Sequence, residues 1–367
     1  MREFKAKIPY DTYQRIFFRK ERDGFGDKSW ADWLGWLSKD VSLKLTIGGI
    51  IQQTTRKGLL DLWLSNFAEN LPYIRHGQNI QIRKSKKPKV HTIADLGNPE
   101  PTNKPERSAI VVGAGPSVWK NKHLDMLAKS DYSGYVVATD RMLVPLLEKG
   151  IIPHLTVTVD GSEIIKKFYD NPLVKKYGPH LKLALVTSVN PKIVQIIIKN
   201  KCTIYWFNPM FDVWSKDDSY TKILYTLSKV ADKGPPLTQA GGNCGTTSWV
   251  FAWELLKASP IGLIGIDFGY LKDTNLKETP YYSSLLHLGK KQAVHSIKEV
   301  YQEVYHPVFK TWAKSDYVFR HYKKAFLSLV KSAKPWVHTI NCTEGGTLFG
   351  PKIECMPFAD FLRRYPT

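Results

Sequence analysis

SAIVVGAGPSVWK, residues 108–120, is the stretch that decides how this chain is expected to fold. An apolar run leads into Gly-Ala-Gly-Pro-Ser, and a helix-like segment follows. Glycine permits a sharp turn, while Pro116 and Ser117 suit the first turn of a helix. The stretch therefore predicts a strand, a tight turn and a helix in succession. The turn either presents free amides to a phosphate or only reverses the chain, and both interpretations stay open.

Apolar runs of the same kind alternate with helix-like segments along most of the remaining chain. We predict strands at 109–113, 135–139, 155–159, 182–187, 203–206, 261–266 and 337–340. We predict helices at about 121–130, 141–149, 162–169, 191–199 and 245–257. Nearly continuous Val/Ile/Leu strands with helices between them indicate a mostly parallel sheet covered on both faces. The expected fold class is α/β, with a Rossmann-like sheet.

The segments that flank this pattern have a different character. Residues 1–76 are expected to be a helical extension, because 29–46 and 57–74 carry apolar residues at helical spacing. That apolar stripe belongs to a core, or it docks on a membrane surface or a partner. Residues 77–107 are expected to be a basic, proline-containing linker.

The Rossmann-like domain is placed at 108–350, with a C-terminal tail at 351–367. Within it, residues 271–335 are rich in Tyr, Lys and His, and their second half has a helical pattern. We expect a helical cap over the sheet or a plain outer helical layer.

Composition excludes several protein classes. The chain has 367 residues, of which 43% are hydrophobic, enough for a sizeable core and one or two domains. Its apolar runs are shorter than the roughly 18 residues that a transmembrane helix needs, and its start has no secretory h-region. The four cysteines are far apart and form no C-x-x-C pair, so we expect no disulfide, no zinc site and a cytoplasmic location.

The formal net charge is +20 at pH 7, with a pI near 9.6. Such a charge attracts polyanions, including nucleic acid, an anionic surface or nucleotides, or it only keeps the protein soluble. The densest basic run, at 82–89, is read as a solvated linker or as a nucleic-acid arm.

Polar residues stand directly after several predicted strands. In open α/β sheets ligands bind outside the carboxyl ends of the strands, so these residues should converge on one crevice. A carboxylate there can bind a metal, hold a ribose hydroxyl, act as a base or cap the next helix. Asp160 is the better site candidate, whereas Asp140 reads equally well as a helix cap. The strand-end residues are Asp140, Asp160, Gly161, Ser188, Asn190 and Asp267.

Two further turns are rich in glycine. The first, TQAGGNCGTTSWVFAWELL at 238–256, can wrap a phosphate or a sugar, or it can start a closely packed helix. Its candidate binding residues are Gly241, Gly242, Asn243, Thr246 and Thr247. The second, HTINCTEGGTLFG at 338–350, carries Glu344. Neither these turns nor the first one match G-x-G-x-x-G or G-x-x-x-x-G-K-[ST], since Val118 stands where the former needs a glycine.

Taken in order, VVGAGPS, ATDRMLVPLLEKGIIPHLTVTVDGS, AGGNCGTTSWVFAWELLKASPIGLIGIDFGY and TINCTEGGTLFG resemble the MptE-like superfamily. That superfamily contains archaeal 6-hydroxymethylpterin diphosphokinases and the Maf proteins of flagellin glycosylation. The resemblance covers roughly 105–350 and implies a nucleotide-binding, Rossmann-like sheet related to sialyltransferases.

The resemblance also implies roles for single residues. Asp140 and Asp160 would line the donor pocket, and Asp267 would end the neighbouring strand. The turn at 241–247 would face the nucleotide or the acceptor. Of these residues, we expect Asp160 and Asp267 to be catalytic. The residues expected to hold the donor phosphates are Gly113, Gly115, Pro116 and Ser117.

Two activities and one binding role remain open. The first is glycosyl transfer from a CMP-nonulosonate-type sugar to a protein or small-molecule acceptor. The second is Mg²⁺- and ATP-dependent diphosphoryl transfer to a hydroxymethylpterin, with Asp160 as the metal ligand, although VTVDG carries only one acid. The third is a non-catalytic polyanion-binding module. The candidates for a general base are His287, His295 and His306.

Overall fold

The computed structural model describes residues 47–77, 90–97, 105, 107–210, 219–229, 234–238, 241–279, 282 and 300–366. The side chains of 47–58 are not described. The predicted helix at 29–46, the basic run at 82–89 and the candidate bases His287 and His295 lie outside these residues.

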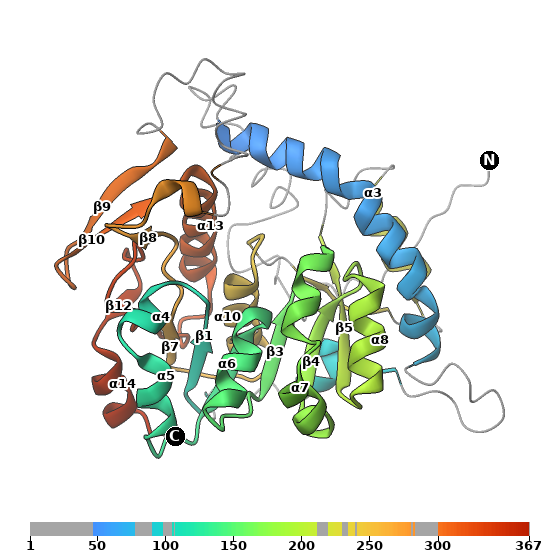
Figure 1. The fold of residues 1–367 in the computed structure, drawn as a ribbon, viewed down its shortest axis with the longest axis horizontal. Helices are drawn as coiled ribbons and strands as arrows, with labels where there is room; N and C mark the ends of the chain where they lie inside the picture. The colour runs from blue at the N-terminus through green and yellow to red at the C-terminus, as the bar shows by residue number, and fades with distance from the viewer. Residues whose placement is uncertain are drawn as a thin grey trace.

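The described strands form a nine-stranded sheet and a small three-stranded sheet (Figure 1). The large sheet has the order β12-β11-β7-β1-β2-β3-β4-β5-β6, and each neighbouring pair in it is parallel. Its strands are β1 (Ala109–Val112), β2 (Tyr135–Thr139), β3 (Leu155–Thr158), β4 (Lys182–Val186), β5 (Thr203–Pro209), β6 (Leu237–Thr238), β7 (Ile261–Ile264), β11 (Thr339–Asn341) and β12 (Ile353–Cys355). The small sheet has the antiparallel order β8-β10-β9, with β8 (Tyr270–Leu271), β9 (Gln302–His306) and β10 (Thr311–Ser315).

Helices connect the strands, and short 3₁₀ segments, labelled η, lie between some of them. The α-helices are α3 (Ile47–His76), α4 (Ser117–Lys120), α5 (His123–Ala128), α6 (Leu143–Glu148), α7 (Pro172–Tyr177), α8 (Pro191–Lys199), α9 (Tyr220–Ser228), α10 (Cys244–Glu254), α13 (Tyr317–Ser332) and α14 (Phe358–Arg364). The 3₁₀ segments are η2 (Ile93–Leu96), η3 (Asp140–Met142), η4 (Glu163–Phe168), η5 (Gly178–His180) and η6 (Leu276–Glu278).

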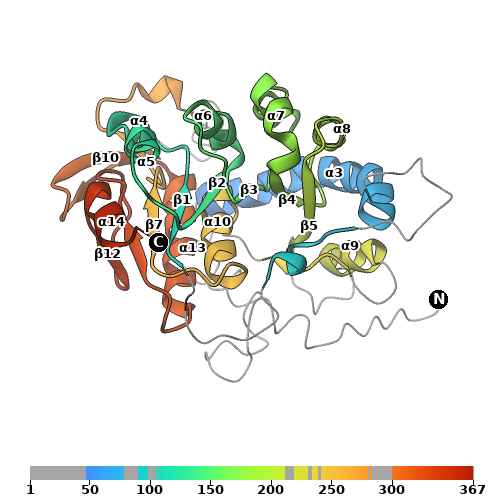
Figure 2. The same cartoon turned by 90° about the horizontal axis from the view of Figure 1, so that it is seen from below.

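Both faces of the large sheet are covered, which confirms the predicted α/β class. Strand β1 shows why, because successive side chains of a strand point to opposite faces. Ile110 and Val112 lie in one apolar cluster, and Ala109 and Val111 lie in the other, all fully buried. Figure 2 shows α6, α7 and α8 along one side of the sheet and α9, α10 and α13 along the other.

The strand order reverses between β1 and β7. From β1 the chain proceeds through β2 to β6 in one direction, and it returns through α10 to place β7 on the other side of β1. The crevice at such a reversal, outside the carboxyl ends of the strands, is where open α/β sheets bind ligands. The topology therefore predicts a ligand site at the turns after β1 and β7.

The predicted helix at 57–74 is part of α3, which crosses the carboxyl ends of β3 and β4. Asn66 Nδ2 donates to the carbonyls of Gly161 and Ser188, at 2.9 and 3.0 Å. Asn70 Nδ2 donates to the carbonyls of Thr187 and Val189, at 3.1 and 2.6 Å. Both asparagines are buried. The apolar stripe beside them packs into the core, because Phe67 and Ile74 belong to the larger buried cluster.

The seven predicted strands are all present, each within three residues of its expected bounds. The expected helix at 121–130 is divided into α4 and α5, and the one at 162–169 is the 3₁₀ segment η4. Residues 351–367, expected to be a C-terminal tail, contribute strand β12 and helix α14, whose Phe358 and Phe361 are fully buried.

The helical pattern predicted for the second half of 271–335 is correct only for α13. Residues 302–315 form the hairpin β9–β10 instead. Pro307 cannot continue a helix, and the aromatic and β-branched residues around it suit strands. Lys310 closes the hairpin at a φ of 53°. No helix within the described ranges is both long and apolar enough to cross a membrane.

Replacing Asn70 with alanine is expected to lower the free energy of unfolding by about 2–4 kcal/mol, because two buried carbonyls lose their donor. Urea unfolding followed by circular dichroism measures this quantity. The control is Glu69→Ala on the exposed side of α3, which should change the free energy of unfolding by less than about 0.5 kcal/mol. Equal effects of the two changes would show that these hydrogen bonds do not hold α3 in place.

Candidate functional site

The Gly-Ala-Gly-Pro-Ser turn after β1 is held against the loop after β7. Gly113 N donates to the Ile264 carbonyl and Gly115 N to the Gly265 carbonyl, both at 2.8 Å. Ser117 N, at the start of α4, donates to Asp267 Oδ2 at 2.8 Å. Three amides of the turn are therefore already engaged by the β7 side. The expectation that Gly113, Gly115, Pro116 and Ser117 hold donor phosphates stays a prediction, and it would require Asp267 to release Ser117.

Close backbone approach explains the glycines in this contact. A Cβ on Gly115 would lie 2.4 Å from Asp267 Oδ2 and 2.7 Å from the Gly265 carbonyl oxygen. A Cβ on Gly265, whose φ is +65°, would lie 2.0 Å from the Gly113 carbonyl oxygen. No side chain fits between these two turns, so glycine is required on both sides.

Asp267 is buried at the centre of this contact, and only 2% of it is exposed. Its Oδ1 has no hydrogen-bond partner among the residues that the structure describes. Burial raises the pKa of this carboxyl to about 6, although the hydrogen bonding of Ser117 opposes the shift. The third glycine-rich turn closes over it, because Thr347 N donates to the Asp267 carbonyl at 2.8 Å.

Glu344 belongs to the same third turn and contacts residues of helices α5 and α14. Its Oε2 accepts from Phe358 N at 3.1 Å and lies 3.0 Å from His123 Nε2. The hydrogen bond with His123 is the main reason that the pKa of Glu344 lies below its ordinary value. His123 is fully buried. Nothing in the sequence around this histidine identified it, since its partner is 221 residues away.

A second acidic group lies at the ends of β2 and β3. Asp140 is 6% exposed, and its Oδ1 accepts from Arg141 N at 2.7 Å. Its Oδ2 accepts from the Cys244 thiol at 3.7 Å, which joins it to the start of α10. Asp160 is exposed, and its Oδ1 accepts from Ser162 N at 2.8 Å.

The environment of Asp140 favours its protonated form. Burial raises its pKa to about 7, and the negative charge of nearby Asp160 contributes in the same direction. Burial likewise raises the pKa of the Cys244 thiol well above its ordinary value, followed by the charge of Asp140. The pair Asp140–Asp160 thus combines a buried acid that titrates near neutrality with an exposed carboxylate, an arrangement that suits acid–base chemistry.

The second glycine-rich turn brings α10 to the same place. Gly241 and Gly242 have φ values of +58° and +79°. Asn243 caps α10 by accepting from Thr246 N at 2.9 Å, and Thr247 Oγ1 donates to the Asn243 carbonyl at 2.9 Å. The turn reaches the Gly-Pro-Ser side as well, because Cβ atoms built on Gly245 and on Gly113 would both contact Ile266.

Other predicted site residues have structural roles in this arrangement. Ser188 is buried and gives its carbonyl to Asn66 of α3, as Gly161 does. Asn190 caps α8 by accepting from Lys192 N at 3.0 Å. His306 is buried in β9, and its Nε2 lies 2.9 Å from the Leu348 carbonyl oxygen. Among the described residues, no three His, Cys, Asp or Glu side chains are placed to hold a metal ion together.

Comparison with known proteins relates the chain to one family. The family model described as "6-hydroxymethylpterin diphosphokinase MptE-like" matches residues 65–273. Among solved structures, a MAf glycosyltransferase from Magnetospirillum magneticum AMB-1 is similar at 13% sequence identity and a TM-score of 0.49. The match covers 90% of this chain and 51% of that protein, so the chain spans about half its length. None of the curated proteins matches the sequence.

Gly115→Ala is expected to lower the free energy of unfolding by about 2–4 kcal/mol, because a methyl group would push Asp267 and the Gly265 carbonyl away. Thermal unfolding by calorimetry gives the value. Gly97→Ala is the matched control, since its Cβ would meet only the Ala94 carbonyl oxygen at an ordinary 3.5 Å. A nearly neutral Gly115→Ala would contradict the close contact between the two turns.

Asp140→Asn is expected to stabilise the protein above pH 7. The folded pKa of about 7 lies above the ordinary 3.8, so the folded state binds the proton more tightly. Wild-type stability is therefore lost as pH rises from about 4 through 7, and asparagine removes this loss, worth about 2–4 kcal/mol at pH 8. Denaturant unfolding between pH 4 and 8 measures the difference. The exposed Asp170→Asn should track wild type, and an Asp140→Asn curve parallel to wild type would refute the expectation.

Proposed function

The chain belongs to the MptE-like family, and on that premise we propose that it is a nucleotide-dependent transferase. The donor would lie across the carboxyl ends of β1, β2, β3 and β7, where the three glycine-rich turns meet. The first candidate reaction is glycosyl transfer from a nucleotide-activated sugar of the CMP-nonulosonate type to a hydroxyl of a protein or small-molecule acceptor.

The observation that carries glycosyl transfer is the pairing of Asp140 with Asp160. In the reaction the bond between the sugar and the phosphate oxygen breaks, and the acceptor oxygen forms the new glycosidic bond. Asp160, exposed at the end of β3, would take the proton of the acceptor hydroxyl. Asp140, which holds a proton near neutrality, would donate a hydrogen bond to the departing phosphate.

The start of α10 is a better place for that phosphate than the start of α4. Helix α4 has four residues, and its Ser117 amide is bound to Asp267. Helix α10 has 11 residues, and its first residue, Cys244, contacts Asp140. The amides of Cys244 and Gly245 make no backbone hydrogen bond to the described residues. Free amides at a helix N-terminus favour an anion, so the phosphate would lie within reach of Asp140.

Asp267 would act as a positioning residue under this proposal. It is buried behind the Gly-Pro-Ser turn, where its carboxylate accepts a hydrogen bond from Ser117 N. From there it would keep the β1 turn at a fixed distance from the donor. Glu344 would hold the third glycine-rich turn in place through its hydrogen bond with His123.

Diphosphoryl transfer to a hydroxymethylpterin is the second candidate. The VTVDG stretch carries one acid, but Asp140 at the neighbouring strand end would supply a second. In support, the charge of Asp160 adds to the effect of burial in raising the pKa of Asp140. Two carboxylates together with donor phosphates are the ligands that Mg²⁺ commonly uses. The description of the matching family favours this reaction.

Metal dependence and product distinguish the two reactions. Purified protein incubated with CMP-N-acetylneuraminate and EDTA is expected to release CMP. With ATP, 6-hydroxymethylpterin and Mg²⁺, the second candidate predicts AMP formation that depends on the pterin. AMP formation without CMP release would show that the second candidate, diphosphoryl transfer, is correct. The absence of both products would contradict a transferase that uses these donors.

Asp140→Asn and Asp160→Asn are each expected to lower kcat by about 100-fold or more, because the first removes the acid beside the departing phosphate and the second removes the base. The pH–rate profile should also change, with the limb near pH 7 lost only in Asp140→Asn. Asp170→Asn, an exposed acid in the same region of the chain, is the control. Wild-type rates in both site variants, at unchanged melting temperature, would exclude this pair from the reaction.

A further inference from the structure

A cavity of about 500 Å³ lies at the amino ends of β2, β3 and β4. This edge of the sheet is opposite the carboxyl ends where the transferase site is proposed. The first residues of these strands, Tyr135, Leu155 and Lys182, line it. Its size falls within the range of small-molecule pockets, about 300–1,000 Å³, and exceeds what a few ordered waters need. The transferase chemistry proposed above makes no use of it.

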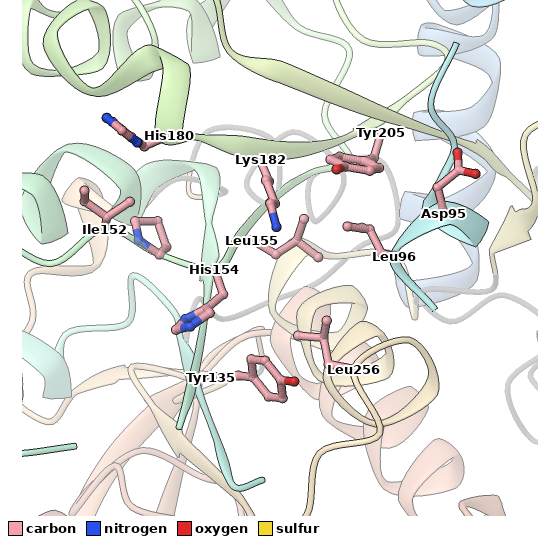
Figure 3. A pocket seen from close by; sticks show the side chains of 11 residues that line it. Asp95, Leu96, Tyr135, Ile152, His154, Leu155, His180, Lys182, Tyr205 and Leu256 are labelled. Carbon is pink, nitrogen blue, oxygen red and sulfur yellow. The ribbon is translucent and has the colours of Figure 1, made fainter. Parts of the chain in front are cut away.

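Sheet register explains how its walls come together. Leu155 and Lys182 stand one step before the registered pair Thr156–Leu183, so they are neighbours on one face. Tyr205 lies two residues along β5 from Thr203, the partner of Lys182, and therefore projects from that same face. Leu256, just after α10, and Leu96 of η2 close the sides. Figure 3 shows these side chains around the cavity.

The cavity combines aromatic and aliphatic side chains with four acidic or basic residues, Asp95, His154, His180 and Lys182. Figure 3 shows the Lys182 ammonium beside Leu155, whereas the Asp95 carboxylate lies on the other side of Tyr205. Burial, followed by the charge of Asp95, raises the pKa of Tyr205. Lys182 forms no ion pair with a described carboxylate. Asp95 Oδ2 is engaged by Thr92 N at 2.7 Å. Arg107, with its guanidinium carbon 5.9 Å from the centre of the Tyr135 ring, adds a second positive charge nearby.

His154 adds a neutral donor to this wall. Its Nδ1 accepts from Val136 N at 3.1 Å, so in the neutral ring the proton resides on Nε2. Burial, followed by the charges of Lys182 and Arg107, lowers its pKa below the ordinary value. The ring packs edge-on against Tyr135, with 5.3 Å between ring centroids. This part of the wall therefore offers an aromatic surface and an N–H donor.

We propose that this amino-edge cavity binds a small aromatic monocarboxylate. The ring would lie between Tyr205, Leu155 and Leu256, and the carboxylate would pair with Lys182. An ammonium without an ion-pair partner beside aromatic and aliphatic side chains favours such an anion over a neutral or cationic ring. The site is separate from the transferase site, because the two lie at opposite ends of the same strands. The inference does not depend on the proposed function.

The test uses 2-naphthoate, a flat fluorescent carboxylate, with 2-naphthylmethylamine as its charge-reversed counterpart. Binding to the full chain is measured by fluorescence titration and saturation-transfer NMR. We expect saturable binding of the carboxylate with a dissociation constant below about 1 mM. The amine should bind at least tenfold more weakly. CMP and ATP should not displace the carboxylate.

Two variants locate the probe. Lys182→Met keeps the stem of the side chain, removes the charge and should weaken 2-naphthoate at least tenfold. Lys199→Met, an exposed lysine at the end of α8, is the matched control and should change binding less than twofold. Leu256→Trp should block the cavity while leaving its charge unchanged. Should that variant unfold, the exposed Lys182→Met still decides the matter.

Several results would overturn the proposal. Equal binding by wild type and Lys182→Met, or equal binding of the acid and the amine, would show that the cation does not select the ligand. Displacement by CMP would place the probe at the carboxyl edge. Absence of binding at 5 mM, roughly the weakest range in which a specific site has meaning, would show that the cavity is not a site for this class.

Discussion

The hydrogen bond from the Ser117 amide to the buried Asp267 carboxylate joins the two strands at which the sheet reverses its order. Around it the backbones of Gly113 and Gly265 approach so closely that neither residue tolerates a Cβ. All other parts of the candidate site are placed relative to this contact. The turn before α10 meets it through Ile266, and the turn that carries Glu344 closes over it through Thr347.

Two buried acids at this edge represent a cost to stability that a purely structural role would not need. Asp140 and Asp267 have pKa values raised to about 7 and 6, and burial is the first cause of both shifts. Groups that hold a proton near neutrality in a crevice are typical of sites that move protons. The contacts of Asp267 and those of the Asp140–Asp160 pair differ in one respect. Asp267 is engaged by two backbone amides, Ser117 N on its carboxylate and Thr347 N on its carbonyl, whereas Asp140 lies near an exposed carboxylate and the start of α10.

The two ends of the strands serve different chemistry. At the carboxyl ends, α3 covers the loops after β3 and β4 through the hydrogen bonds of Asn66 and Asn70. At the amino ends the layer between α10 and η2 leaves a cavity with one available ammonium.

The sequence by itself determined the sheet and the edge at which the site lies. Apolar residues on both faces of each strand identify a buried parallel sheet, and strand-end polar residues identify its carboxyl edge, because both signals are local. Only the tertiary structure decided which of those residues converge. Ser188 and Asn190 follow a strand as Asp160 does, yet α3 and α8 engage them. Three contacts join residues more than 100 positions apart: His123 with Glu344, Cys244 with Asp140, and Ser117 with Asp267. No periodicity along the chain encodes such contacts, since they arise when the strand order reverses and brings distant turns to one place.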